Sequence, residues 1–283
     1  MKIQSKEVPF EIYKEKSLLS GVLTVTPQGL LGDGLMEFNN AEVTSKKFKY
    51  NSRTFNTDTC DFRLKTYDLR EMAFITENYQ GQVDMDKRKG EFRSNGGLSR
   101  ISFPANNFIC YMDQFDWYMD KDEIDLRSKD KIPEANKTDD PRKLVDLKLT
   151  GSEFISVHPT QDSLRFLTNR ANYNLKDQII YAHDVQLIRI ADAAIVPHDG
   201  KVTILRKAEI LPLEKAKILA NTKSKYHLIY DATVNLYGRN SYKATGKYNY
   251  IDELEQVQII NFAEIGVDAS KKTFAKAAIG DSI

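Results

Sequence analysis

The chain has 283 residues, enough for one large all-β domain or two of ordinary size, each with a substantial core. Its 41 basic and 40 acidic side chains leave a formal net charge of +1, so no long-range field attracts nucleic acid or an anionic bilayer. The sequence contains no run of about eighteen apolar residues, and we therefore expect no membrane span.

The first sixteen residues carry a basic residue, Lys2, near their start but lack the apolar stretch of a signal peptide. The chain is then either cytoplasmic or part of a longer exported, envelope-associated protein. Cys60 and Cys110 are the only cysteines. Two buried thiols are the preferred interpretation, because a domain of this size needs no disulfide, and a bridge between them is the alternative.

Short runs of β-branched and aromatic residues, separated by Gly, Asn, Asp and Lys, dominate the chain. Apolar and polar residues alternate in 46–68, 202–207, 232–238, 242–252 and 255–262. A period of two is typical of antiparallel sheets with one solvated face. The segment 211–222 is the best helix candidate, although its neighbours favour strand. We predict an all-β fold of stacked or rolled antiparallel strands, β-solenoid-like or β-jellyroll-like.

Glycine-rich GLLGDG at 29–34 has neither the spacing of a phosphate loop nor a following Lys-Ser/Thr. It is interpreted as a turn between two strands. An Ala followed two residues later by an aliphatic or aromatic residue recurs along the chain at irregular spacing, which favours repeated, stacked rungs.

The composition changes abruptly at 119–143, which is crowded with charge and contains Pro133 and Pro141. This stretch is interpreted as an exposed linker or long loop. The predicted organisation is an N-terminal β lobe at 1–119, the charged segment at 120–143 and a C-terminal β lobe at 144–283. Two lobes sharing one continuous sheet, with the charged segment as an excursion, is the alternative.

The stretch 191–213 contains the polar residues of a catalytic loop, with His198 beside Asp199 and Gly200. Pro-X-Asp-Gly between two apolar strands is also turn chemistry, and this interpretation is preferred because no partner base or nucleophile can be assigned. His158, preceding a proline, is expected to open a loop. His183 and His227 are expected on strand faces, and this dispersed set predicts no metal site and no cofactor.

Three acidic motifs are weighed for calcium or glycan chemistry. The segment 84–91 has Arg88 where a ligand oxygen is needed and its glycine one place late, which rejects a calcium loop. In 120–125 a solvated charge run is preferred over a loose cation site formed by Asp120, Asp122 and Glu123. Asp58 and Asp61 fall on opposite faces of a regular strand, which disfavours a glycosidase pair.

Aromatic residues gather in two regions, and we predict that they form a binding surface. Alternation over 109–118 places four residues on one face, Ile109, Tyr111, Phe115 and Trp117, and a second aromatic group follows near 242–250. Such rows stack sugars or bind proteins; the alternative is that they cover the core and the lobe junction. The predicted binding residues are Tyr111, Phe115, Trp117, Tyr242, Tyr248 and Tyr250.

The last segment, 262–283, starts like another strand pair but lacks a polar cap. An open final strand exposes unpaired backbone groups. We therefore expect an exposed edge that pairs with further repeats, another domain or another copy; simple fraying of the terminus is the alternative.

The strand-turn rhythm at 36–62 and 162–188, with RANY at 170–173 and AHDV at 182–185, resembles the repeats of OstA/LptA-type β-jellyroll proteins of bacterial envelopes. It is also similar to segments of large β-rich envelope proteins of Bacteroidetes. The resemblance implies an open β-roll that handles lipid or belongs to an envelope assembly. The expected function is a non-catalytic structural or binding module contacting a protein, lipid or glycan. A polysaccharide-active β-helix enzyme and a lipid-transport β-roll are the alternatives.

Overall fold

The computed structural model describes residues 1–5, 8–14, 17–66, 70–97 and 99–277. The protein is nearly all β, with 59% of its residues in strands and 7% in helices, and the pairings are antiparallel. This confirms the predicted fold class. The chain divides into two compact units: unit 1 comprises Met1–Lys129 with Ala171–Ile179, and unit 2 comprises Asp130–Arg170 with Ile180–Ile283. Each unit is described separately below.

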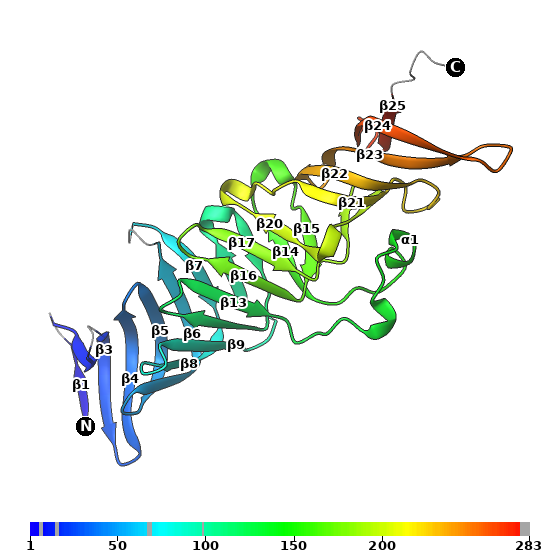
Figure 1. Ribbon diagram of the computed structural model, residues 1–283. Helices are drawn as coiled ribbons and strands as arrows, with labels where there is room; N and C mark the ends of the chain where they lie inside the picture. Colours follow the sequence, from blue (N-terminus) through cyan, green and yellow to red (C-terminus); the bar gives the residue numbers. More distant parts are fainter. Residues whose placement is uncertain (6–7, 15–16, 67–69, 98, 278–283) are drawn as a thin grey trace. The chain divides into compact units, whose positions relative to one another are not determined.

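The elements of unit 1 run from the N-terminus to the first part of the charged segment (Figure 1). They are β1 (Lys2–Gln4), β2 (Phe10–Tyr13), β3 (Ser17–Thr26), β4 (Gly29–Phe38), β5 (Ala41–Tyr50), β6 (Thr54–Lys65), β7 (Met72–Glu77), β8 (Tyr79–Asp84), β9 (Lys89–Ser94), β10 (Arg100–Phe103), η1 (Pro104–Asn106), β11 (Phe108–Cys110), β12 (Gln114–Tyr118) and β13 (Glu123–Arg127), with most of β16 (Arg170–Asn174).

Unit 1 begins as a meander and then branches at the long strand β6. The first half of β6 pairs with β8 and its end, Arg63–Lys65, pairs with β7. One branch continues from β8 through β9 and β12 to β13, and the other from β7 through β10 to β11. Successive hairpins thus alternate between two layers, which bury the apolar faces of both between them.

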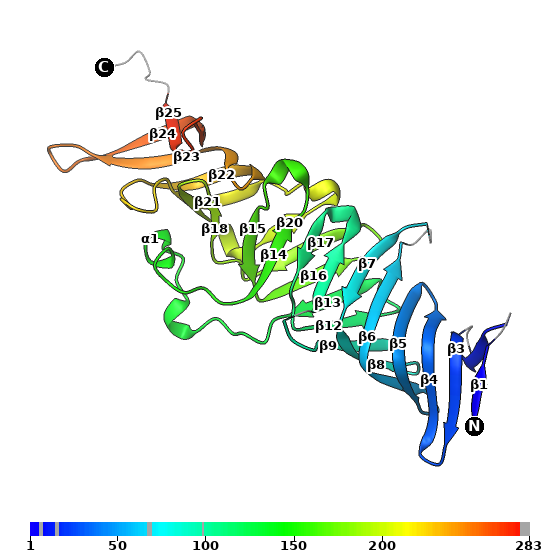
Figure 2. The same ribbon diagram turned by 180° about the vertical axis from the view of Figure 1, so that it is seen from behind.

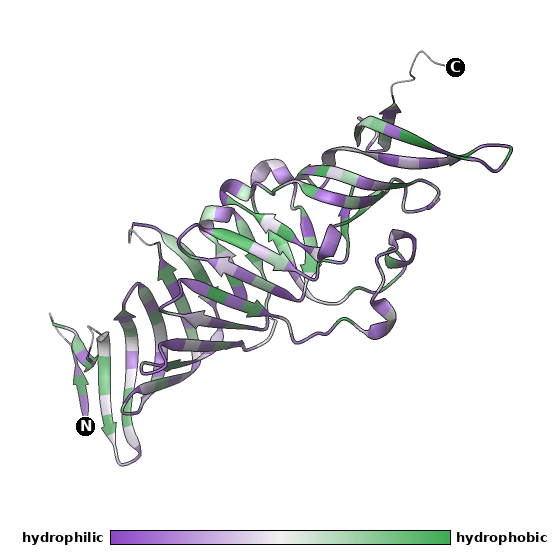
Figure 3. Cartoon of the chain, viewed as in Figure 1, coloured by the Kyte–Doolittle hydropathy of each residue, from purple (hydrophilic) through white to green (hydrophobic). Residues whose placement is uncertain are grey.

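Aromatic rings fill the space between the two layers of unit 1. The Phe115 ring of β12 stacks on Phe92 with 4.5 Å between centroids and meets Phe74 of the opposite branch at 5.1 Å. Trp117 lies 5.2 Å from Phe62 and is 1% exposed. Hydrophilic and hydrophobic residues alternate along the strands (Figure 3), and in β12 the buried Phe115 and Trp117 alternate with less buried neighbours.

The prediction of a turn at the glycine-rich segment 29–34 is wrong, because these residues form the start of strand β4. The turn falls before it, at Pro27–Gln28. Gly34 pairs directly with Gly21 of β3, and a Cβ built on Gly21 would lie 2.0 Å from the carbonyl oxygen of Asp33. The glycines therefore permit close approach of two backbones within a sheet.

The predicted linker 120–143 is only partly a loop. Glu123–Arg127 forms β13, which pairs with β12 along its whole length, and Ile124 and Leu126 are fully buried. Two apolar residues with period two are enough to add a strand to an existing edge, even among many charges. The charged segment therefore contributes its first part to the core of unit 1.

The elements of unit 2 include most of β17 and end with a long meander. They are η2 (Glu134–Asn136), α1 (Pro141–Leu144), β14 (Ser152–Ser156), η3 (Pro159–Gln161), β15 (Arg165–Thr168), β17 (Ile179–His183), β18 (Ile188–Ile190), β19 (Ala193–Val196), η4 (His198–Gly200), β20 (Val202–Ile204), η5 (Arg206–Ala208), β21 (Leu213–Leu219), β22 (Leu228–Gly238), β23 (Ser241–Ile251), β24 (Val257–Val267) and β25 (Thr273–Ala277). The helix candidate at 211–222 is thus strand β21, as its neighbours favoured.

One ladder of unit 2 runs from β14 through β15, β18, β19, β21, β22, β23 and β24 to β25. A second, short ladder pairs β17 with β20. The part of the main ladder that follows β21 is visible in two opposite views as the C-terminal end of unit 2 (Figures 1 and 2).

The remainder of the charged segment, together with the residues up to Leu149 that follow it, covers the outer face of β19 and β21. Leu144 of α1 is buried in a cluster with Leu187, Ala194, Val196 and Leu219. Lys217 of β21 donates to Asp139, and Arg189 donates to the carbonyl oxygen of Val145 at 2.9 Å. Because both faces of β19 are covered, all four of its residues are buried, which explains an uninterrupted apolar run in an otherwise alternating sequence.

Candidate binding surface

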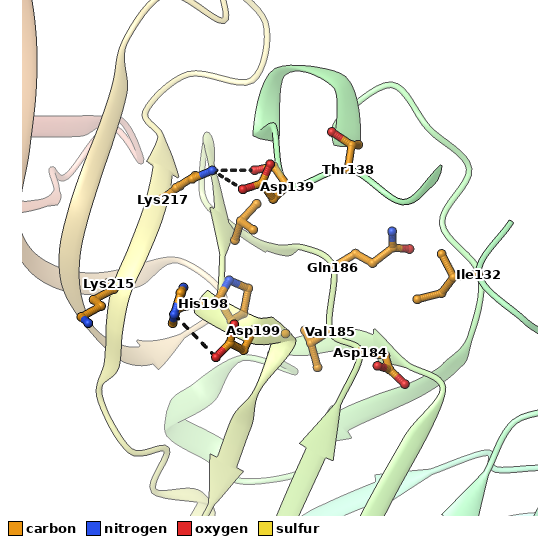
Figure 4. A pocket seen from close by; sticks show the side chains of 13 residues that line it. Ile132, Thr138, Asp139, Asp184, Val185, Gln186, His198, Asp199, Lys215 and Lys217 are labelled. Atoms are coloured by element: carbon orange, nitrogen blue, oxygen red, sulfur yellow. Dashed lines mark hydrogen bonds and ion pairs between the residues drawn. The ribbon is translucent and has the colours of Figure 1, made fainter. Parts of the chain in front are cut away.

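The stretch at 191–213 contributes to a pocket of about 370 Å³ in unit 2, lined by both apolar and charged residues (Figure 4). His198 and Asp199 lie in the tight turn η4, where Asp199 and Gly200 have positive φ angles of 55° and 63°. This is the backbone geometry expected of a turn. The residues that line the pocket are Ile132, Thr138, Asp139, Asp184, Val185, Gln186, Val196, Pro197, His198, Asp199, Gly200, Lys215 and Lys217.

Three acidic residues of this pocket, Asp139, Asp184 and Asp199, lie beside basic side chains. Lys217 donates to Asp139, and this hydrogen bond lowers the pKa of the Asp139 carboxyl. Arg170 donates to Asp184 at 2.9 Å, and His198 lies 3.5 Å from Asp199. The contact between Lys217 and Asp139 holds the charged segment against the sheet.

The other histidines considered in the sequence are separated in the structure. The His158 ring caps the short helix η3 by accepting from the backbone N–H of Thr160. His183 lies on β17. Its pKa is lowered mainly by burial and, to a smaller extent, by the nearby positive charge of Arg170. Within the ranges that the structure describes, no three His, Cys, Asp or Glu side chains are placed to hold a metal ion.

Asp58 and Asp61, weighed as a glycosidase pair, have separate partners in unit 1. Asp58 forms an ion pair with Lys49 at 3.0 Å. Asp61 accepts from the backbone N–H of Asn78 at 3.1 Å. Both Cys60 and Cys110 are free, buried thiols, and burial raises the pKa of the Cys60 thiol to about 12; the preferred interpretation of the cysteines is thereby confirmed.

The predicted aromatic surface is divided between core and solvent. Phe115, Trp117 and Tyr242 are almost fully buried, so these three are core residues and the prediction of a surface position was wrong for them. Tyr111, by contrast, is 43% exposed. The expected common face fails because residues 111–113 form the irregular connection between β11 and β12, which interrupts the alternation.

Tyr248 and Tyr250 lie on the hairpin of β23 and β24, which projects beyond its neighbours (Figures 1 and 2). The pairing of β22 with β23 extends only to Ile229 opposite Tyr248, and that of β25 with β24 only to Ala277 opposite Phe262. Residues 249–261 therefore pair only with each other among the described strands. We call this segment the arm.

The arm exposes large apolar side chains on both of its faces. The exposed fractions are 47% for Tyr250, 63% for Ile251, 78% for Leu254, 59% for Val257 and 61% for Ile259. Three acidic residues, Asp252, Glu253 and Glu255, lie at its tip, and no Lys or Arg occurs between residues 248 and 270. An isolated two-stranded hairpin with such a surface gains little stability by itself.

An apolar groove of about 260 Å³ lies at the base of the arm. The His227 ring, 5.6 Å from Tyr248, and the Phe262 ring, 6.0 Å from Tyr248, form a row across it. Asp192 holds β25 at the groove, because its carboxylate accepts from both the N–H and the hydroxyl of Thr273. The lining residues are Ala220, His227, Ile229, Tyr248, Ile260, Phe262, Thr273, Phe274 and Ala275.

Sequence reasoning identified Tyr248 and Tyr250 but missed the apolar residues of the arm. The available signal was the loss of alternation in YIDELEQVQII, 250–260, where apolar residues occur at both parities around an acidic turn. Such a pattern is typical of a strand pair with two apolar faces. The prediction instead treats these residues as ordinary strands with one buried face.

The edge strand expected near the C-terminus is β25, which among the described strands pairs with β24 alone. Thr273 directs its N–H toward Asp192, and alternate residues of an antiparallel strand point the same way. Ala275 and Ala277 therefore turn their backbone groups away from β24. The remainder of the expected edge, 278–283, lies outside the described residues.

None of the helices in the described part of the chain has the length and apolarity needed to cross a bilayer.

The chain has no match among protein-family models, curated proteins or solved structures.

Proposed function

We propose that the protein is a non-catalytic structural or binding module that contacts a partner through the faces and edges of its C-terminal sheet. The exposed apolar arm supports this proposal most strongly. Side chains such as Ile251, Leu254 and Ile259 have no role in the core, and clusters of exposed large apolar residues are typical of interaction surfaces. The open backbone edge at Ala275 and Ala277 provides a second means of contact.

A polypeptide is the preferred partner class. Acidic residues at the arm tip disfavour contact with an anionic bilayer, while exposed main-chain groups beside an apolar groove suit an added strand. The envelope setting comes from the resemblance to OstA/LptA-type proteins and remains a prediction.

Site-specific photo-crosslinking in producing cells tests this proposal. A photoreactive aromatic residue is placed at Tyr250 or Ile259, and in a matched control at Tyr181, which is 37% exposed in the same unit. We expect defined polypeptide adducts from the two arm positions and none of the same mass from Tyr181. Equal adducts at all three positions, or none at all, would contradict a binding role for the arm.

Two further measurements separate the alternatives. Mass spectrometry of organic extracts of the purified protein would show co-purified acyl chains if it is a lipid-transport roll; we expect none. Alanine replacement of Asp58, Asp61, His158 and His198, assayed on a glycan panel, would remove an activity if it is a polysaccharide enzyme; we expect no cleavage by the unmodified protein.

A further inference from the structure

We infer that the partner of the arm is a second copy of this chain, bound so that each arm tip lies at the base of the other arm. This inference rests on the proposed function and names its partner. It follows from three features of the C-terminal end of unit 2. These are a projecting apolar arm, an apolar groove at the base of the arm, and opposite charges at the tip and the base of the arm.

The arm and the groove have complementary surfaces. Leu254 at the turn is the most exposed apolar residue of the arm, and Ile251 and Val257 beside it are also largely exposed. The groove presents half-buried Tyr248, Phe262 and their apolar neighbours. Burying the arm tip in a matching groove removes both apolar surfaces from water at once.

The charges determine the direction in which two arms can pair. The tip carries Asp252, Glu253 and Glu255, whereas the segments that continue from the groove lining carry lysines on both flanks. Lys223 follows Ala220 on one flank, and Lys271 and Lys272 precede Thr273 on the other. Two carboxylates also lie near the base, but both already accept hydrogen bonds: Asp192 from Thr273, and Asp268 from the backbone N–H of Lys272. Two arms side by side with tips together would oppose three acids with three acids, which is unfavourable.

An antiparallel arrangement about a two-fold axis removes this repulsion. Leu254 in the turn follows Tyr248 by six positions, which corresponds to an arm of roughly 20 Å at about 3.3 Å per residue. When two such arms lie antiparallel, each acidic tip reaches the lysine-flanked base of the other. The contact is isologous and closed, so it gives a dimer and not a filament.

Sedimentation velocity of the purified chain, from micromolar to near-millimolar concentration, tests for the dimer. We expect a reversible monomer–dimer equilibrium that weakens with added salt. Replacing Ile251 and Val257 together by Ser should raise the dissociation constant at least about tenfold, with circular dichroism unchanged because both side chains are exposed. A Tyr181→Ser control should dimerise like the unmodified chain.

Charge reversal tests the arrangement itself. One variant carries Glu253→Lys and Glu255→Lys at the tip; the other carries Lys223→Glu and Lys271→Glu at the base. Asp252 is left in place because it accepts the N–H groups of Leu254 and Gln256 in the turn. Each variant alone should be monomeric, and an equimolar mixture should form heterodimers, since both contacts then join opposite charges.

Three results would overturn the inference: a monomer at every concentration, dimers that the tip and base variants leave intact, or a mixture that remains monomeric. The proposed binding function has a separate test, because crosslinks from Tyr250 to a different polypeptide would sustain that function while excluding a second copy as the partner. Adducts with twice the mass of the chain are expected if both proposals hold.

Discussion

Replacing Phe115 by Ala should destabilise unit 1 strongly, because this ring is at the centre of the interlayer core. Phe115 is fully buried and contacts Phe74, Tyr79 and Phe92 at centroid distances of 5.1, 5.2 and 4.5 Å. Removing the ring would leave a cavity that these rigid neighbours can fill only in part.

The magnitude follows from the area that the ring keeps from water. A buried Phe side chain covers roughly 150 Å², which at about 25 cal/mol per Å² corresponds to about 4 kcal/mol. This value lies within the loss of stability of about 3–5 kcal/mol that Phe→Ala substitutions cause in protein cores. We therefore expect the free energy of unfolding of unit 1 to fall by about 4 kcal/mol.

Tyr111→Ala is the matched control from the same predicted aromatic row. Its side chain is 43% exposed, so the loss should be below about 1 kcal/mol.

Urea unfolding followed by tryptophan fluorescence measures both variants. Trp117 is the only tryptophan of the chain and lies in the same core, so its emission reports on unit 1 specifically. A Phe115→Ala variant that lost less than about 1 kcal/mol, or lost no more than Tyr111→Ala, would refute the two-layer core and favour the surface position predicted from alternation.

Three further predictions concern unit 2. Leu144→Ala should loosen the segment that covers β19, at a cost of about 2–5 kcal/mol, and limited proteolysis should then cut within 130–150 before the sheet is degraded. Asp192→Ala should release β25 from its bonds to Thr273, which faster amide exchange in β25 alone would show. His183 has a lowered pKa, so the neutral imidazole stabilises the fold above the ordinary histidine pKa and this contribution is lost as pH falls. A His183→Gln variant should lose less stability on acidification than the unmodified chain, measured by urea unfolding at several pH values.

Local pattern determined much of the secondary structure of this protein, but not the strands that begin at Gly29 and Glu123. Alternation at 202–207 and 232–238 corresponds to β20 and β22, and the Pro-X-Asp-Gly sequence at 197–200 forms the tight turn η4. These features depend on neighbouring residues in the chain, because side-chain alternation and positive-φ turn residues act over two to four positions.

Tertiary structure decided which residues of each pattern are buried. Alternation placed Tyr111, Phe115 and Trp117 on one face, but a connection before β12 changes the phase, and the second layer of unit 1 covers only the latter two. Ile251 and Val257 belong to strands as regular as those of the core, yet they are exposed because neither β22 nor β25 extends beside them. Burial depends on what another part of the chain places opposite a strand, and periodicity within the strand does not contain that information.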